Sequence, residues 1–255
     1  MGFYDLSKKE RQNLVFNIEK DILLDLESDS KENILKYFSD EDTYIRKTAY
    51  LTIGKLYKSN AVSHAKLIAA LESYLSSENH SIRQTTINAA GEIGMINFES
   101  VQQFFDTALF DKHHTVRNAV IGSLKKMGAK NPIPALKWAK QYLRHEDKEI
   151  RREICHGIEL RGRTHPQDIL PLLRELQFDT TARVGNTLVH VLGQIAYKKG
   201  CLATVISELN TWENKELVIK AIDEIVDVHQ RYKSFAAMTQ QEAIDYIDNN
   251  FNDLT

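Results

Sequence analysis

Apolar and polar residues follow helical spacing along this chain, and one arrangement of them returns several times. In the segment Asp111–Gly128, a polar stretch is followed by Val116, Val120 and Leu124 on one helical face, and Gly128 favours a helix end. This segment therefore predicts a short polar turn that leads into an amphipathic helix.

The segment has counterparts before and after it. Aligned on Val116, equivalent apolar residues recur at one interval of 37 residues and four intervals of 34 residues. Copies of one unit at a near-constant period indicate a solenoid, in which each copy buries its apolar face against its neighbours. The aligned positions are Ile45, Ile82, Val116, Ile150, Val184 and Val218.

Each copy is predicted to contain a first helix, a polar turn, and a second helix that begins near the aligned position. The sequence therefore predicts an all-α fold, a right-handed superhelical α-solenoid of about six helix pairs. The predicted first helices are Glu32–Phe38, Leu67–Leu75, Val101–Leu109, Ile133–Leu143, Ile169–Leu176 and Leu202–Leu209.

The two ends of the chain are predicted to cap the repeats. Ser7–Leu26 has the spacing of an amphipathic helix, and Thr239 with Glu242 forms a capping box before a second apolar run. We expect one repeat domain over residues 1–255, with an N-terminal cap at 1–30, repeats at 31–230 and a C-terminal cap at 231–255.

Composition supports an ordered chain. Hydrophobic residues make up 42% of the sequence, which contains only 11 Gly and 4 Pro. It has no apolar run of membrane-spanning length, and its first residues lack the apolar core of a signal peptide. We therefore expect a cytoplasmic protein that does not bind a membrane.

Cys155 and Cys201 lack metal-ligand spacing and are predicted to be small buried side chains.

The repeats resemble those of HEAT-repeat proteins. Their pattern is a turn acid, an apolar residue followed by Arg, a small or apolar residue, and Leu-Gly or Ile-Gly; one copy has Asp40, Ile45-Arg46, Ala49 and Ile53-Gly54. The resemblance covers about residues 30–230 and implies that second helices line a concave, partner-binding face. It also implies a structural role for Arg46, Arg83, Arg117 and Arg151, which would bond turn acids of the same or the next repeat.

Charge is unevenly distributed along the chain. From Lys112 to Arg163 there are 13 Lys and Arg but 5 Asp and Glu, a local surplus of +8, within a chain of net charge -2. A basic middle favours an acidic partner, either a nucleic acid or an acidic protein segment.

The binding residues are predicted from their offsets behind each aligned position. Offsets of 2, 6 and 9 residues lie on one helical stripe, where we expect exposed side chains that could contact phosphates or hydrogen-bond a partner. The alternative is that they are ordinary solvated helix residues. The candidates are Asn118, Lys125, Arg152, His156, Glu159, Asn186 and His190, with Arg161 and Arg163 as a possible phosphate-binding loop.

Nothing in the sequence predicts a cofactor, a metal site or a catalytic centre. His113-His114 has no carboxylate or Cys at ligand spacing, and no nucleophile elbow, P-loop, dinucleotide fingerprint or zincin motif is present. His156 and Glu159 are three residues apart, a spacing that is common on solvated helix faces.

The segments KELVIKAIDEIVDVHQRYKSF and MTQQEAIDYIDNNF resemble the C-terminal end of the bacterial alkylpurine DNA glycosylases, which have a HEAT-like fold. Those enzymes place Trp residues and a catalytic Asp on a basic groove. Here Trp138 and Trp212 fall in or beside first helices, Glu159 and Asp227 are the only acids near basic residues on the predicted face, and no residue matches a catalytic position.

The sequence therefore predicts a non-catalytic scaffold whose basic concave middle binds nucleic acid or an acidic protein. The alternatives are a glycosylase-related protein of alkylation repair and a pure protein–protein adaptor.

Overall fold

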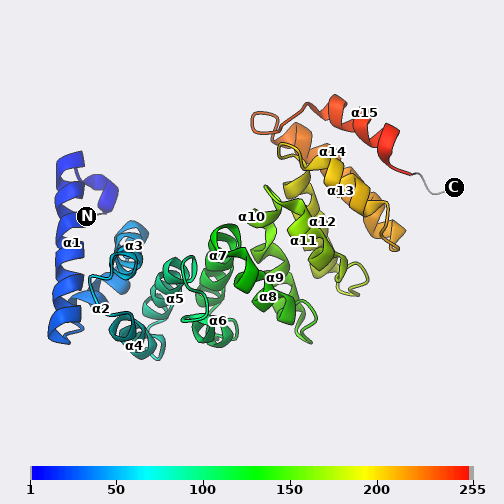
Figure 1. The fold of residues 1–255 in the computed structure, drawn as a ribbon. Helices are drawn as coiled ribbons and strands as arrows, with labels where there is room; N and C mark the ends of the chain where they lie inside the picture. Colours follow the sequence, from blue (N-terminus) through cyan, green and yellow to red (C-terminus); the bar gives the residue numbers. More distant parts are fainter. Residues whose placement is uncertain (1, 253–255) are drawn as a thin grey trace. The chain divides into compact units, whose positions relative to one another are not determined.

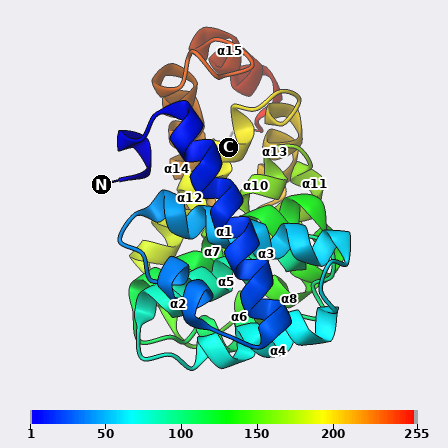
Figure 2. The same cartoon turned by 90° about the vertical axis from the view of Figure 1, so that its left-hand side faces the viewer.

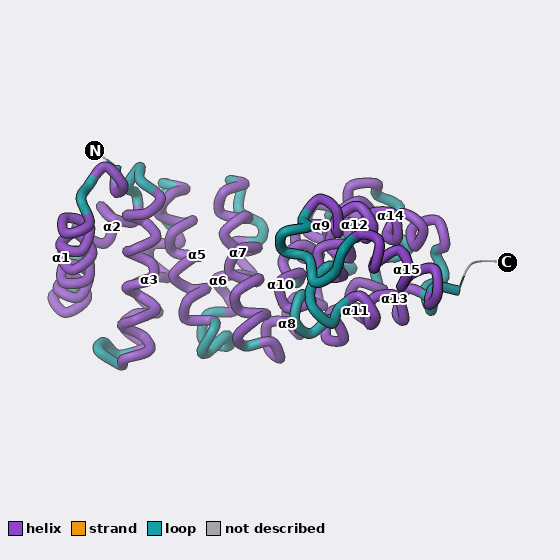
Figure 3. Tube along the Cα trace, turned by 90° about the horizontal axis from the view of Figure 1, so that it is seen from above, coloured by secondary structure: helices purple, strands orange, loops and turns teal. Residues whose placement is uncertain are grey.

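The computed structural model describes residues 2–252, and most of these residues are helical. They form α-helices and one short 3-10 helix, Phe3–Asp5, and contain no strand (Figures 1 and 3). The predicted all-α class is confirmed, as are six helix pairs with a cap helix at each end.

The helices fall into two compact units, Met1–Asn131 and Pro132–Thr255. The prediction of one continuous domain stays a prediction. The first unit contains α1 (Lys8–Ser28) and the pairs α2 (Glu32–Phe38) with α3 (Thr43–Ser59), α4 (His64–Leu75) with α5 (His80–Gly94), and α6 (Gln102–Ala108) with α7 (His114–Lys130). The second contains α8 (Pro132–Tyr142) with α9 (Lys148–Gly157) and α10 (Glu159–Gly162), α11 (Pro166–Arg174) with α12 (Ala182–Ala196), α13 (Leu202–Leu209) with α14 (Lys215–Arg231), and α15 (Gln240–Asn250).

Side-chain caps set where the helices begin. The Ser7 hydroxyl accepts a hydrogen bond from the Glu10 amide and so caps α1, which lies over α2 and α3 in the first unit (Figure 2). At α15, Thr239 and Glu242 form the predicted capping box. Four second helices, α3, α5, α9 and α14, begin after Asp or Asn residues whose side chains accept an amide hydrogen bond.

The aligned apolar positions form the core. Ile82, Val116, Ile150, Val184 and Val218 are buried, whereas Ile45 in the first repeat is only half-buried. This periodic burial explains why the sequence pattern repeats.

Second helices of neighbouring repeats pack side by side: α3, α5 and α7 in the first unit, and α9, α12 and α14 in the second. Glycine permits the close approach of α3 to α5, because a Cβ atom added at Gly54 would lie 2.6 Å from Cβ of Glu92.

No helix within residues 2–252 combines the length and apolarity needed to cross a bilayer.

Candidate functional site

The predicted binding residues belong to both units. Asn118 and Lys125 lie on α7 of the first unit, and Asn118 is exposed. In the second unit, α12 carries Asn186, which is exposed, and His190, which is half-buried. The others in that unit lie on or directly after α9 and α10: Arg152, His156, Glu159, Arg161 and Arg163.

The structure brings three of these side chains together in the second unit. His156 Nε2 lies 3.2 Å from Glu159 Oε2, and the ring of His190 is 6.2 Å from that of His156 between centroids. Suitable ligand atoms of all three lie within 4.8 Å of one another, so this cluster could hold a metal ion. We call it the His156–Glu159–His190 cluster.

One expectation about this cluster is wrong. Glu159 was predicted on an exposed stripe, but its side chain is 2% exposed. The carboxylate is covered because α10 packs against α12 of the next repeat. It is compensated there by Arg163, whose Nη2 donates to Glu159 Oε1 and, at 2.9 Å, to Gln194 Oε1.

The proposed phosphate-binding arginines already have carboxylate partners. Arg161 donates to Asp168 at 2.8 Å from Nε and 2.6 Å from Nη2, and Arg163 contacts Glu159. Arg152 pairs with Glu149. A phosphate would have to compete with these carboxylates, and its binding at Arg161 and Arg163 stays a prediction.

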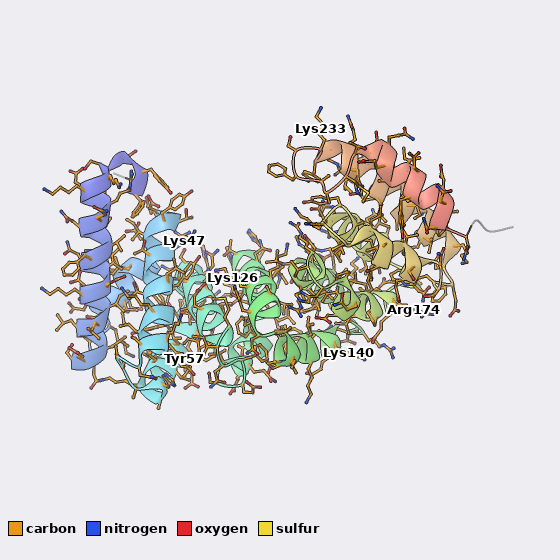
Figure 4. The ribbon with its side chains drawn as sticks, turned by 45° about the horizontal axis from the view of Figure 1, so that its top comes forward. Lys47, Tyr57, Lys126, Lys140, Arg174 and Lys233 are labelled. Atoms are coloured by element: carbon orange, nitrogen blue, oxygen red, sulfur yellow. The ribbon has the colours of Figure 1, made fainter. Side chains whose placement is uncertain are left out.

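The basic block as a whole is strongly compensated by acids. At least eight of its 13 cations form ion pairs, and several of the carboxylates come from outside the block; Lys140 and Arg144, for example, both reach Glu175 (Lys140 is labelled in Figure 4). The paired cations are Lys112, Lys126, Lys140, Arg144, Arg151, Arg152, Arg161 and Arg163. The linear surplus of +8 therefore overstates the positive charge available to a partner.

The arginines after the aligned positions have structural contacts. Arg83 and Arg151 each make two hydrogen bonds to an Asp of the following turn, Asp111 and Asp179. Burial would raise the pKa of each Asp, but the bonds from Arg and from a backbone amide outweigh it and hold the pKa below its ordinary range.

The other two of these arginines donate to backbone carbonyls of the turn. Arg46 Nη1 donates to the backbone carbonyls of Asp40 and Glu41, and Arg117 Nη1 donates to the carbonyl of Asp111 at 2.8 Å. For Arg46 the corresponding residue of the next turn is Ser77, which offers no carboxylate. Arg83 and Arg151 also donate to carbonyls of their own turn, so this bond is shared by all four arginines.

A groove in the first unit was missed by sequence reasoning. It has a volume of about 770 Å³ and lies between α3 and α5 at their C-terminal ends. Two large apolar side chains are exposed there, Leu51 at 41% and Ile96 at 52%. We call it the α3–α5 groove, and it is lined by Leu51, Gly54, Lys55, Lys58, Ser59, Glu92, Met95, Ile96 and Lys130.

The charges around this groove are mainly positive. Lys58 and Lys130 are exposed and have no carboxylate partner among residues 2–252, and Lys55 is exposed although it pairs with Glu19. The single acid of the lining, Glu92, pairs with Lys126 at 2.7 Å (Lys126 is labelled in Figure 4). Among the residues that line the groove, only Leu51 and Gly54 lie at the offsets used to predict binding residues, 6 and 9 residues after Ile45. The other lining residues lie at different positions.

The tryptophan and cysteine side chains of the second unit are buried. Trp138 and Trp212 are 1% and 0% exposed, so neither can stack on a base at the surface. Cys155 and Cys201 are free and buried, as predicted. Asp227 forms an ion pair with Arg231.

Comparison with known proteins identifies the fold. Residues 28–108 match the family model of Cnd1, non-SMC mitotic condensation complex subunit 1. The structure is similar to AlkD2 from Streptococcus mutans, with 14% identity and a TM-score of 0.53 over 80% of this chain and 97% of that chain. It is also similar to the MAST/Orbit N-terminal domain, with 16% identity and a TM-score of 0.52 over 77% and 96%. No curated protein matches the sequence. The chain thus has the fold of HEAT-like helical-repeat proteins.

Proposed function

We propose that this chain is a non-catalytic scaffold that binds an acidic amphipathic segment of a partner protein in the α3–α5 groove. The observation that supports this function is the exposure of Leu51 and Ile96 beside Lys58 and Lys130, two lysines with no carboxylate partner among residues 2–252. Apolar side chains gathered in a groove with a charged rim are typical of protein interaction surfaces.

The lining determines what kind of segment would bind. Apolar side chains of the partner would cover Leu51, Met95 and Ile96, while acidic side chains on either side would meet Lys58 and Lys130. An amphipathic helix presents such a pattern, with apolar residues at every third or fourth position and acids beside them. The acidic protein partner expected from the sequence is therefore kept, but its proposed site moves to the first unit.

A protein partner is favoured over a nucleic acid because most of the positive charges between Lys112 and Arg163 are already paired with carboxylates of the same chain. Nucleic-acid affinity depends on several cations that can release counterions from phosphates together. Most of the cations between Lys112 and Arg163 are in ion pairs. An additional contact at the exposed amide of Asn118, in the first unit, remains part of the proposal, and binding at Asn186 in the second unit stays a separate prediction. Duplex DNA is an outcome of the test.

Peptide display tests this function without assuming a partner sequence. A random library of 16-residue peptides is selected on the wild-type protein and counter-selected on the variant Leu51→Asp/Ile96→Asp. The matched control is Ile133→Asp/Phe178→Asp, which changes two other exposed apolar residues, at 83% and 61% exposure.

We expect enriched peptides with acidic and apolar residues at helical spacing, which bind the wild type and the control but not the Leu51→Asp/Ile96→Asp variant. Enrichment of basic peptides, or of peptides that bind all three proteins equally, would contradict the proposal. Binding of duplex DNA that exceeds peptide binding would favour the nucleic-acid function. Release of methylated bases from alkylated DNA would favour the glycosylase-related alternative.

A further inference from the structure

We propose that the His156–Glu159–His190 cluster is a site for a divalent transition-metal ion such as Zn²⁺. The proposal concerns only the second unit and does not depend on the α3–α5 groove. Two imidazoles and one carboxylate form a donor set that Zn²⁺ uses widely in proteins.

The repeat explains why these side chains meet. His156 and Glu159 are three residues apart, which places them on one face where α9 leads into α10. His190 is 34 residues after His156 and so occupies the same position in the next repeat, on α12. Because α12 packs against both α9 and α10, the two histidines face the carboxylate from adjacent repeats.

The distances allow a metal ion to enter with small side-chain movements. Ligand atoms about 2.1 Å from a tetrahedral ion are roughly 3.4 Å from one another. His156 Nε2 and Glu159 Oε2 are already 3.2 Å apart, and all ligand atoms are within 4.8 Å. The histidine side chains are 38% and 42% exposed, so they can rotate inward from the surface.

Surrounding groups hold the carboxylate and adjust the charge. Arg163 donates to Glu159 Oε1, while Oε2 lies 3.2 Å from His156 Nε2, so Arg163 helps to orient the carboxylate. Glu224 Oε1 lies 3.7 Å from His190 Nδ1, so a second carboxylate stands beside the cluster. These two carboxylates offset the positive charge of Arg163 and of Arg231, which pairs with Glu224.

A bound ion would join α9 and α10 to α12, and would therefore stabilise the packing of two neighbouring repeats. Metal that binds only the folded protein raises the unfolding temperature. The expected role is structural, and no reaction is assigned to the ion.

The test uses Co²⁺ as a spectroscopic probe for the Zn²⁺ site, since Co²⁺ in a tetrahedral site absorbs visible light strongly. Metal-free wild-type protein, His190→Gln and His156→Gln/His190→Gln are titrated with Co²⁺ and then with Zn²⁺. His165→Gln is the matched control, because His165 lies in the same unit outside the cluster. Glu159 is left unchanged because its loss would leave the half-buried Arg163 without its carboxylate partner.

We expect one Co²⁺ per chain with tetrahedral absorption in the wild type and in the control, displacement by Zn²⁺, and a higher unfolding temperature with Zn²⁺. Affinity should fall at least about tenfold in His190→Gln and be lost in the double variant, while circular dichroism stays unchanged. Equal binding by the wild type and the double variant would overturn the proposal. So would a wild-type spectrum without tetrahedral absorption.

Discussion

Arg83 and Asp111 form a two-point ion pair between consecutive repeats. Arg83 Nε donates to Asp111 Oδ2 at 2.7 Å, and Nη2 donates to Oδ1 at 2.9 Å. The side chains are 8% and 11% exposed, so water screens the pair poorly. Asp111 also accepts the amide hydrogen of His113, and thereby fixes the turn before α7.

Removing one partner of this pair should destabilise the first unit. We expect Asp111→Ala to lower the free energy of unfolding by roughly 3 kcal/mol, because Arg83 would remain buried without its carboxylate. Asp111→Asn should cost less, since the amide oxygen can still accept from His113. Urea unfolding measures both effects, with Glu216→Gln as the control, because the pair of Glu216 with Lys220 is exposed.

The pair also predicts an acid dependence. The pKa of Asp111 is lower in the folded protein than in the unfolded chain. Its contribution to the free energy of unfolding is therefore complete at pH values above the unfolded-state pKa of about 3.9, and it is lost as the pH falls through the folded-state pKa. The wild type should therefore lose its advantage over Asp111→Asn in that acid range. An advantage that is constant down to about pH 2 would contradict this assignment.

Two glycines in second helices should respond to alanine with opposite signs. A Cβ atom at Gly54 would lie 2.6 Å from Cβ of Glu92, so Gly54→Ala should force α3 and α5 apart and cost about 1–3 kcal/mol. Gly122 lies inside α7 with no atom within 4 Å of an added Cβ, so Gly122→Ala should gain about 0.5–1 kcal/mol. Chemical unfolding of both variants tests the pair; the same sign for both would show that repeat spacing is not set at Gly54.

The fold could be predicted because its determinants are local. Each repeat carries the same apolar anchor and polar turn, so helix order, caps and buried anchors such as Val116 follow from spacing alone. The burial of Glu159 could not be predicted in this way, because it depends on how α10 packs against α12.

The α3–α5 groove was missed for a related reason. Lys58, Ile96 and Lys130 come from three different helix ends, and their common location depends on the packing between repeats. For His156 and His190, by contrast, the interval of 34 residues contained a usable signal, since equal positions in adjacent repeats lie next to each other.

His113, in the first unit, should make stability fall at mildly acidic pH. The ring of His113 stacks on His80 at 3.7 Å with 3° between the planes, and on His114 at 4.9 Å. Burial and these neighbouring imidazoles lower the pKa of His113. The folded state favours the uncharged ring. The contribution of His113 to the free energy of unfolding is therefore complete above about pH 6.5 and is lost as the pH falls through the lowered pKa.

NMR titration of the imidazole resonances measures this effect. His113 should titrate below the value of an unfolded peptide, and its pKa should rise in the variant His80→Gln, which removes one repelling ring. The urea midpoint of the wild type should also fall more than that of His113→Gln as the pH is lowered from about 7.5 to about 5.5. A His113 pKa that is ordinary in the wild type, or unmoved in His80→Gln, would refute the account of the stack.

The proposed function is tested most directly by the charge of the groove rim. Affinity of a display-selected acidic peptide is measured by fluorescence anisotropy for the wild type and for Lys58→Glu/Lys130→Glu. The control is Lys137→Glu/Lys148→Glu, which makes the same change in net charge on the second unit. We predict about tenfold weaker binding to the rim variant, little change in the control, and recovery when acidic residues of the peptide are replaced by Lys. Equal affinity of the peptide for the wild type and the rim variant would contradict the proposal that an acidic segment binds in the α3–α5 groove.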